Sequence, residues 1–117
     1  MGYCNCPKKN DFVSPRGYAF EKLTEELDKI KSLGINALYI GPIFESTAHG
    51  YDTLDYFHVD RRLGNNQSFA AFCDECHNRG IAVVLDAVFN HTGRNFFAFR
   101  DLQEKGRNSQ YKDWYLN

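Results

Sequence analysis

The chain has 117 residues, of which 43% are hydrophobic and 15% aromatic, enough for one domain with a buried core. Its 14 basic and 15 acidic residues are mixed along the chain and leave a net charge of -1, which argues against nucleic acid or an anionic membrane as a partner. No apolar run is long enough to span a membrane or to serve as a secretion signal, so we expect a cytoplasmic protein.

The first half of the chain predicts an irregular start, a helix and a short strand. Residues 1–16 show no periodicity and contain Pro7 and Pro15. From Tyr18 to Leu33, apolar residues recur every three or four positions, which predicts a helix that ends at Gly34. Ile35–Ile40 follows as an apolar strand, which the Gly-Pro pair after it ends.

The segment of residues 41–67 is too long for a plain connection and is rich in aromatic and acidic side chains. Flat aromatic surface beside hydrogen-bonding groups suits a sugar, which presents both apolar C–H faces and hydroxyls. The alternative is that Tyr51, Tyr56 and Phe57 only pack the loop against the core.

A second helix and strand lead to a cluster of polar residues. The pattern predicts a helix over Ser68–Arg79, with Ser68 as its N-cap, followed by a strand that starts at Ile81 and is buried on both faces. Asp86, Asn90 and His91 come at the carboxyl end of that strand. Helix, strand, helix and strand in alternation indicate an α/β fold with a parallel sheet, whose ligands bind at this end of the strands.

The four cysteines allow two interpretations. Cys73, Cys76 and His77 match the C-x-x-C-H pattern of haem attachment, and Cys4 and Cys6 could complete a four-sulfur metal site. However, Cys73 and Cys76 also fall on the apolar stripe of the predicted helix, where free cysteine packs as a small hydrophobic residue. We favour this structural role and expect no metal site.

Three segments in the expected order resemble the α-amylase family, glycoside hydrolase family 13. They are the strand region Gly34–Pro42, the loop His49–Gly64 and the segment Asp86–His91, which matches the pattern Asp-x-x-x-Asn-His. The tail Arg94–Tyr115 is similar to neopullulanases, cyclomaltodextrinases and maltogenic amylases in particular.

The resemblance implies a fragment of a (β/α)8 TIM barrel, because a complete barrel needs about 250 residues. Residues 17–93 would hold the first helix, second strand, second helix and third strand of the barrel. Residues 94–117 would begin the domain B that is inserted after the third strand, and residues 1–16 remain irregular.

The resemblance also implies roles for five residues. Tyr51 would stack on the sugar ring at the cleavage subsite, with Asp52 as the neighbouring acid, and His91 would bond the primary hydroxyl of the same sugar. Asp86 would support the site by pairing with an arginine beyond this chain. Asn90 matches an asparagine that binds calcium in many α-amylases.

The implied function is part of a retaining hydrolase that acts on maltodextrin, cyclodextrin, pullulan or starch. Such enzymes need a nucleophile and a general acid, and in this family both follow later strands, so we expect no catalytic residue here and no activity from the chain alone. The resemblance leaves open calcium as a cofactor of the full-length parent, a homodimeric parent, and transfer in place of hydrolysis. The alternative is a non-catalytic carbohydrate-binding or interaction module.

Overall fold

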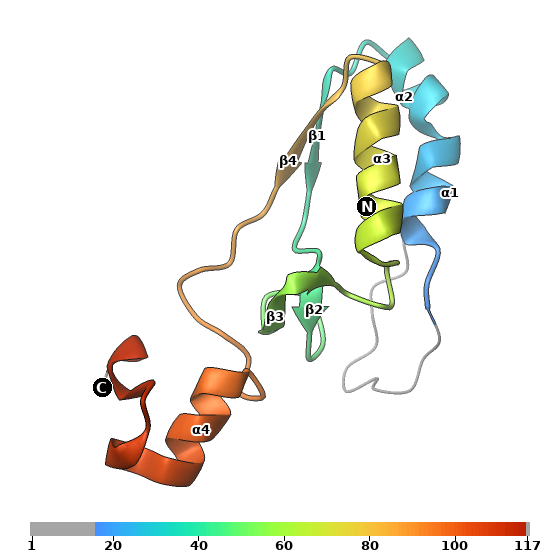
Figure 1. Cartoon of the computed structure of the whole chain (residues 1–117). Helices are drawn as coiled ribbons and strands as arrows, with labels where there is room; N and C mark the ends of the chain where they lie inside the picture. The colour runs from blue at the N-terminus through green and yellow to red at the C-terminus, as the bar shows by residue number, and fades with distance from the viewer. Residues whose placement is uncertain (1–15, 117) are drawn as a thin grey trace.

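The computed structural model describes residues 16–116, which fold into a mixed α/β arrangement (Figure 1). Strand β1, Ala37–Ile40, pairs in parallel with β4, Ala82–Leu85, so that Ala37 lies opposite Ala82. The predicted alternation of helix and parallel strand is therefore confirmed. The described residues form no closed barrel, because this sheet has two strands.

The helix predicted over Tyr18–Leu33 is present as two segments, α1 from Ala19 to Glu25 and α2 from Leu27 to Ser32. The Thr24 hydroxyl donates a hydrogen bond of 2.8 Å to the carbonyl of Phe20, one turn earlier. A side chain that bonds the backbone in this way bends a helix, which explains the interruption at Glu26.

The second helix, α3, runs from Asn66 to Asn78, and its N-cap is Asn65. The prediction of Ser68 as the N-cap is wrong. The Asn65 side chain accepts a bond of 2.7 Å from the Ser68 amide, and the Ser68 hydroxyl accepts one of 2.9 Å from the Asn65 amide. Ser68 is thus the third residue of the helix in a capping box, and the helix begins three residues before Phe69, the first residue of its apolar stripe.

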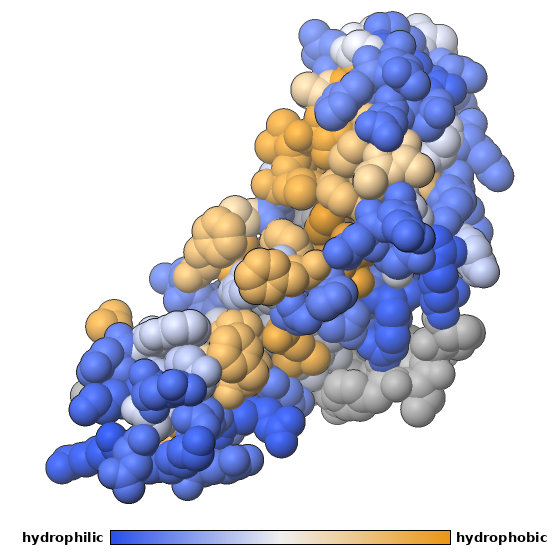
Figure 2. Space-filling view, viewed as in Figure 1, coloured by the Kyte–Doolittle hydropathy of each residue, from blue (hydrophilic) through white to orange (hydrophobic). Residues whose placement is uncertain are grey.

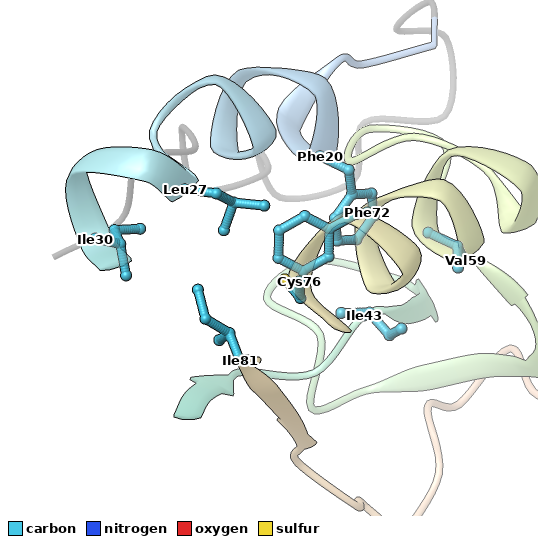
Figure 3. Packing of buried hydrophobic residues seen from close by; sticks show 8 residues of the cluster. All are labelled: Phe20, Leu27, Ile30, Ile43, Val59, Phe72, Cys76 and Ile81. Atoms are coloured by element: carbon cyan, nitrogen blue, oxygen red, sulfur yellow. The ribbon is translucent and has the colours of Figure 1, made fainter. Parts of the chain in front are cut away.

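Helices α1, α2 and α3 cover one face of the β1–β4 sheet, and the core lies between them (Figures 1 and 3). Cys76 is buried there and Cys73 packs against the cluster, which confirms the predicted apolar stripe of α3. Burial raises the pKa of the Cys76 thiol. The core consists of Phe20, Leu27, Ile30, Ile43, Val59, Phe72, Cys76 and Ile81.

The opposite face of the sheet is open, so the prediction of a strand buried on both faces is wrong for β4. Tyr39 on β1 is 68% exposed and Val84 on β4 is 48% exposed. Apolar residues gather over these two strands in Figure 2. An apolar run predicts burial, but the described residues supply helices on one side of the sheet only.

The segment 41–67 contains a hairpin that its sequence did not predict. Strand β2, Phe44–Ser46, pairs antiparallel with β3, Thr53–Val59. The register shifts on both sides of Glu45, so the pairing is irregular. A strand of three residues with an irregular register has no regular alternation to reveal it.

The last described residues form α4, Phe97–Lys105, and two short 3-10 helices, Gly106–Asn108 and Lys112–Trp114. They lie at the end of the molecule away from α1–α3, and the described chain is elongated, 55 × 27 × 24 Å (Figure 1). Their assignment to an inserted domain stays a prediction. Among residues 16–116, no helix is long and apolar enough to cross a membrane.

The capping box predicts a specific stability effect. Asn65→Ala should lower the free energy of unfolding by about 1 kcal/mol, because the Ser68 amide loses its acceptor. Gln67→Ala, an exposed change in the same helical turn, is the matched control and should have less than about half that effect. Urea unfolding followed by circular dichroism measures both, and equal losses would contradict the assignment of the cap.

Candidate functional site

The candidate site lies at the carboxyl ends of β1 and β4, where Asp86 directly follows β4. The Asp86 amide donates a hydrogen bond of 3.0 Å to the carbonyl of Ile40, which continues the strand pairing and fixes its backbone. The phenols of Tyr39 and Tyr51 both bond the Asp86 carboxylate, and these hydrogen bonds raise the pKa of each tyrosine. Asp86 thus joins two segments of the site, one from β1 and one from the β2–β3 loop.

His91 lies beside Tyr51, although 40 residues separate them in sequence. The Nε2 atom of His91 is 2.7 Å from the carbonyl oxygen of Tyr51. A carbonyl only accepts hydrogen bonds, so Nε2 carries the proton, and in the neutral ring Nδ1 remains an acceptor. The structure therefore brings together three of the predicted residues, Tyr51, Asp86 and His91.

Tyr56 fixes the backbone that carries His91. Its hydroxyl lies 2.7 Å from the carbonyl of Val88 and 3.2 Å from the carbonyl of His91. The Tyr56 ring also packs against Phe96 at a centroid distance of 5.7 Å. The interpretation of Tyr56 as loop packing is therefore incomplete, because its hydroxyl also ties β3 to the segment after β4.

Gly93 allows this segment to approach the β2–β3 loop closely. The Gly93 amide donates a bond of 2.8 Å to the carbonyl of Thr53. A Cβ atom at position 93 would lie 2.5 Å from the carbonyl oxygen of Asp52, which is closer than atoms can approach. Only glycine therefore permits the contact that places His91 next to Tyr51.

A buried ion pair anchors the other end of the loop that carries Tyr51. The side chains of Asp60 and Arg62 are 3% and 5% exposed, and they meet at 2.6 Å and 2.8 Å. Asp60 also accepts a bond of 3.1 Å from the Ser46 amide, and the Ser46 hydroxyl accepts one of 3.0 Å from the Gly50 amide. The pair is thus connected to the residue before Tyr51.

The charge state of Asp60 follows from this environment. Burial alone would raise the pKa of its carboxyl, but the hydrogen bonds from Arg62 outweigh burial and hold the pKa below its ordinary value of 3.8. Asp60 is therefore ionised at neutral pH. Buried ion pairs add little net stability, so their main effect is to select one geometry, here that of the β2–β3 loop.

Two predicted site residues, Asp52 and Asn90, do not belong to the cluster of Tyr51, Asp86 and His91. The Asp52 carboxylate lies 3.7 Å from His49 Nδ1, and its Oδ1 atom is buried without a hydrogen-bond partner in the described part of the chain. Asn90 is exposed and its side chain bonds no described residue. Within residues 16–116, no group of three or more His, Cys, Asp or Glu side chains could hold a metal ion. Cys4 and Cys6 lie outside the described residues.

An aromatic cleft of about 770 Å³ extends from His91 toward the C-terminal helices. Four of its rings are largely exposed, with Phe57 at 86%, Phe89 at 76%, Trp114 at 61% and Phe97 at 55%. The sequence did not predict the cleft, the role of Tyr39 or the Asp60–Arg62 pair. The sequence did contain one indication that Tyr39 lies at the site. Tyr39 is the second-last residue of a predicted strand, and Asp86 stands at the end of the strand expected to pair with it in parallel.

Comparison with known proteins gives a consistent result. The sequence profile of the family described as "Alpha amylase, catalytic domain" matches residues 19–117. Neopullulanase 2 of Thermoactinomyces vulgaris is 50% identical over 111 residues, which cover 94% of this chain and 18% of that protein. A cyclomaltodextrinase of Bacillus sp. is 45% identical over 100 residues, covering 85% of this chain and 18% of that protein.

A solved structure agrees with these relatives. The cyclic alpha-maltosyl-(1→6)-maltose hydrolase of Arthrobacter globiformis superposes with a TM-score of 0.80 at 40% identity, over 98% of this chain and 26% of that one. That hydrolase has also been solved with its cyclic substrate and with maltose. The chain thus spans about a fifth of the length of the curated relatives that it matches.

The Asp60–Arg62 pair predicts an acid-sensitive fold. Because the Asp60 pKa is lowered in the folded state, its contribution to stability is present above about pH 4 and is lost as the pH falls through the folded pKa. Asp60→Asn should remove about 3 kcal/mol at pH 7, since the buried Arg62 loses its carboxylate, and should flatten the loss in acid. Urea unfolding at pH 7 and in acid measures both effects.

Asp28→Asn provides the matched control, because Asp28 is 85% exposed and pairs with Arg79 on the surface. This change should leave stability at pH 7 nearly unchanged. If the two variants lost the same stability, the buried pair would not be the anchor of the loop.

Proposed function

Because the chain belongs to the alpha-amylase catalytic-domain family, we propose that it supplies part of the sugar-binding subsite of a retaining α-glucan hydrolase. The substrates would be maltodextrin, cyclodextrin, pullulan or starch. The observation that carries the proposal is the contact of 2.7 Å between His91 Nε2 and the Tyr51 carbonyl, beside the bond from the Tyr51 phenol to Asp86. These contacts gather an aromatic ring, an imidazole and a carboxylate at the carboxyl end of the sheet.

The arrangement of Tyr51 and His91 suits one glucose unit. Tyr51 is 45% exposed, and its exposed ring surface can stack against the C–H face of a sugar. His91 already uses Nε2 on the Tyr51 carbonyl, and Nδ1 therefore accepts the hydrogen bond from a sugar hydroxyl. Asp52 would stand at the loop as the neighbouring acid.

Asp86 acts as a positioning residue in this proposal. Its carboxylate bonds the phenols of Tyr39 and Tyr51, and it therefore sets the orientation of the ring on which the sugar stacks. A carboxylate accepts several hydrogen bonds, so Asp86 can also pair with an arginine supplied by the rest of the parent enzyme. Asn90 remains an exposed side chain at the same edge, and calcium binding there would belong to the parent.

Bond cleavage requires groups that this chain does not supply in our proposal. A retaining glycosidase needs two carboxyl groups about 5 to 5.5 Å apart, one as nucleophile and one as general acid. The nucleophile would attack the anomeric carbon while the acid protonates the leaving oxygen, and water would then release the sugar. The residues described here bind and orient the glucose unit during both steps.

Calorimetry with maltoheptaose tests the proposal directly. Tyr51→Ala should weaken binding by about tenfold or more, because the sugar loses its stacking surface. Tyr18→Ala removes an exposed tyrosine outside the site and should leave the affinity unchanged. Loss of binding in both variants, or in neither, would refute the subsite.

A turnover assay separates the subsite from an active enzyme. The purified chain should release no reducing sugar from maltoheptaose while it still binds this sugar. Product formation that persists in repeated preparations would disprove the proposal that the bond-breaking groups lie elsewhere. Binding without any stimulation of cleavage by the rest of a parent catalytic domain would favour the non-catalytic binding module.

Tyr56→Phe tests how His91 is positioned. The change removes the hydroxyl that lies between the Val88 and His91 carbonyls and keeps the ring packing. We expect a stability loss of about 1 kcal/mol and a several-fold weaker affinity for maltoheptaose. Tyr18→Phe, which changes an exposed tyrosine outside the site, is the control. Unchanged affinity in Tyr56→Phe would show that His91 is held by other contacts.

A further inference from the structure

Two histidines hold the backbone of Tyr51 from opposite sides. The Tyr51 amide donates a hydrogen bond of 3.2 Å to Nδ1 of His49, and the Tyr51 carbonyl accepts one of 2.7 Å from Nε2 of His91. The second contact orients His91 in the candidate subsite, whereas the first involves a histidine that the subsite does not use. We propose that His49 is a proton-sensitive positioning residue, which releases the Tyr51 amide in acid and pairs with Asp52 instead. This inference rests on the proposed function and adds pH control to the same site.

Protonation affects the two histidine contacts differently. Nδ1 of His49 accepts a hydrogen bond from an amide, so the proton of the neutral ring is on Nε2. A protonated imidazole has no acceptor, and the bond to the Tyr51 amide is therefore lost when His49 gains a proton. His91 donates to a carbonyl and keeps its bond in either state. Of these two contacts, the one with His49 is thus the one that depends on pH.

The Asp52 carboxylate provides the alternative partner for His49. Its Oδ1 atom lies 3.7 Å from the same Nδ1, and this oxygen is buried without a hydrogen-bond partner within residues 16–116. A buried oxygen without a donor is costly, and a charged N–H···O bond is stronger than the bond of an amide to a neutral ring. Once Nδ1 carries a proton, a movement of about 1 Å brings the pair into hydrogen-bond range.

The turn that carries these residues keeps the exchange local. Gly50, which directly follows His49, has a φ of +96°, which glycine adopts without strain. Its amide donates a bond of 3.0 Å to the Ser46 hydroxyl, and the Thr47 amide donates one of 3.1 Å to the Asp52 carbonyl. Neither bond involves the His49 ring, so the ends of the loop stay in place while the ring changes its partner.

His49 is open to protons from the solvent, because its side chain is 61% exposed. Histidine ordinarily changes its charge between about pH 5 and pH 8. The titratable or charged groups that face this turn from its own loop and from the segments packed against it are Tyr51, Asp52, Asp60, Arg62, Asp86 and His91. Within this set, the buried oxygen without a partner belongs to Asp52. Asp52 is therefore the group that receives the new bond.

His58 provides a comparison within the same chain. Its Nδ1 atom lies 2.6 Å from the Asp55 carboxylate, which only accepts, so His58 donates this bond already in its neutral state. Protonation of His58 strengthens an existing pair and releases no backbone amide. The same two residue types therefore form no switch there, because Nδ1 of His58 does not act as an acceptor.

A nuclear magnetic resonance titration of the native chain tests the exchange without a sugar. From about pH 8 to about pH 5, the Tyr51 amide proton and the Asp52 carboxyl carbon should shift with the midpoint of the His49 ring. The Tyr51 amide should also lose about tenfold of its protection against hydrogen exchange, because one hydrogen bond is lost. This range lies above the pH at which the Asp60–Arg62 pair weakens. A Tyr51 amide that keeps its protection while His49 titrates would overturn the proposal.

His49→Asn is the matched variant, because an asparagine oxygen can accept the bond from the Tyr51 amide but does not titrate. In this variant, protection of the Tyr51 amide should stay constant, and the Asp52 carbon should show no step at a histidine midpoint. His58→Asn removes the comparison histidine and should leave the response of Tyr51 as in the native chain. Circular dichroism checks the fold, and the native titration decides the outcome if His49→Asn does not fold.

Calorimetry at neutral and acid pH links the exchange to sugar binding. Acid should weaken maltoheptaose binding in the native chain, because Tyr51 loses one of the two contacts that fix its backbone. Protonation of His91 also removes an acceptor for the sugar, so part of this loss is expected in every variant. His49→Asn should therefore retain at least about threefold more of its neutral affinity in acid than the native chain does.

The outcomes separate this inference from the proposed function. An equal loss of affinity in acid for the native chain and His49→Asn would overturn pH control through His49 and leave the subsite intact. Absence of heat with every glucan at neutral pH would overturn the proposed function, and with it the role of His49 in binding. The titration of the Tyr51 amide still decides the bond exchange in that case, because it needs no sugar.

Discussion

The parallel pairing of β1 with β4 determines where the polar groups of this chain meet. Parallel strands end at the same edge of a sheet, so Asp86 after β4 lies beside the end of β1 and within reach of Tyr39. The loop between β2 and β3 crosses the same edge and brings Tyr51 to the same carboxylate. Without this pairing, residues 35 or more positions apart would have no reason to converge.

The loop itself needs a second constraint, because a loop of polar residues has little apolar surface to bury. Two polar contacts supply it, the buried Asp60–Arg62 pair at one end and the close approach of Gly93 at the other. Neither contact is an efficient source of stability. Both, however, accept only one geometry, which is the property that a binding site requires of the loop that carries its ring.

Sequence reasoning succeeded where a repeating apolar pattern controls the structure. The stripes of α1, α2 and α3 and the two parallel strands follow from side-chain periodicity. The roles of the site residues came from the family resemblance and stay predictions. Sequence reasoning failed where a single polar contact determines the local structure. Asn65 rather than Ser68 caps α3 because two side-chain bonds select the start, and Tyr56 positions His91 through one hydroxyl.

The failures at β4 and in the cleft have a different origin. An apolar residue predicts burial in general but does not say which partner buries it, and Val84 and Phe89 are both open in the described chain. The core lies on the helix side of the sheet (Figures 1 and 3), whereas the candidate site lies at the carboxyl ends of the strands and the cleft is lined by residues that follow them. Residues of the site contribute little to that core, so binding and folding depend on largely separate contacts.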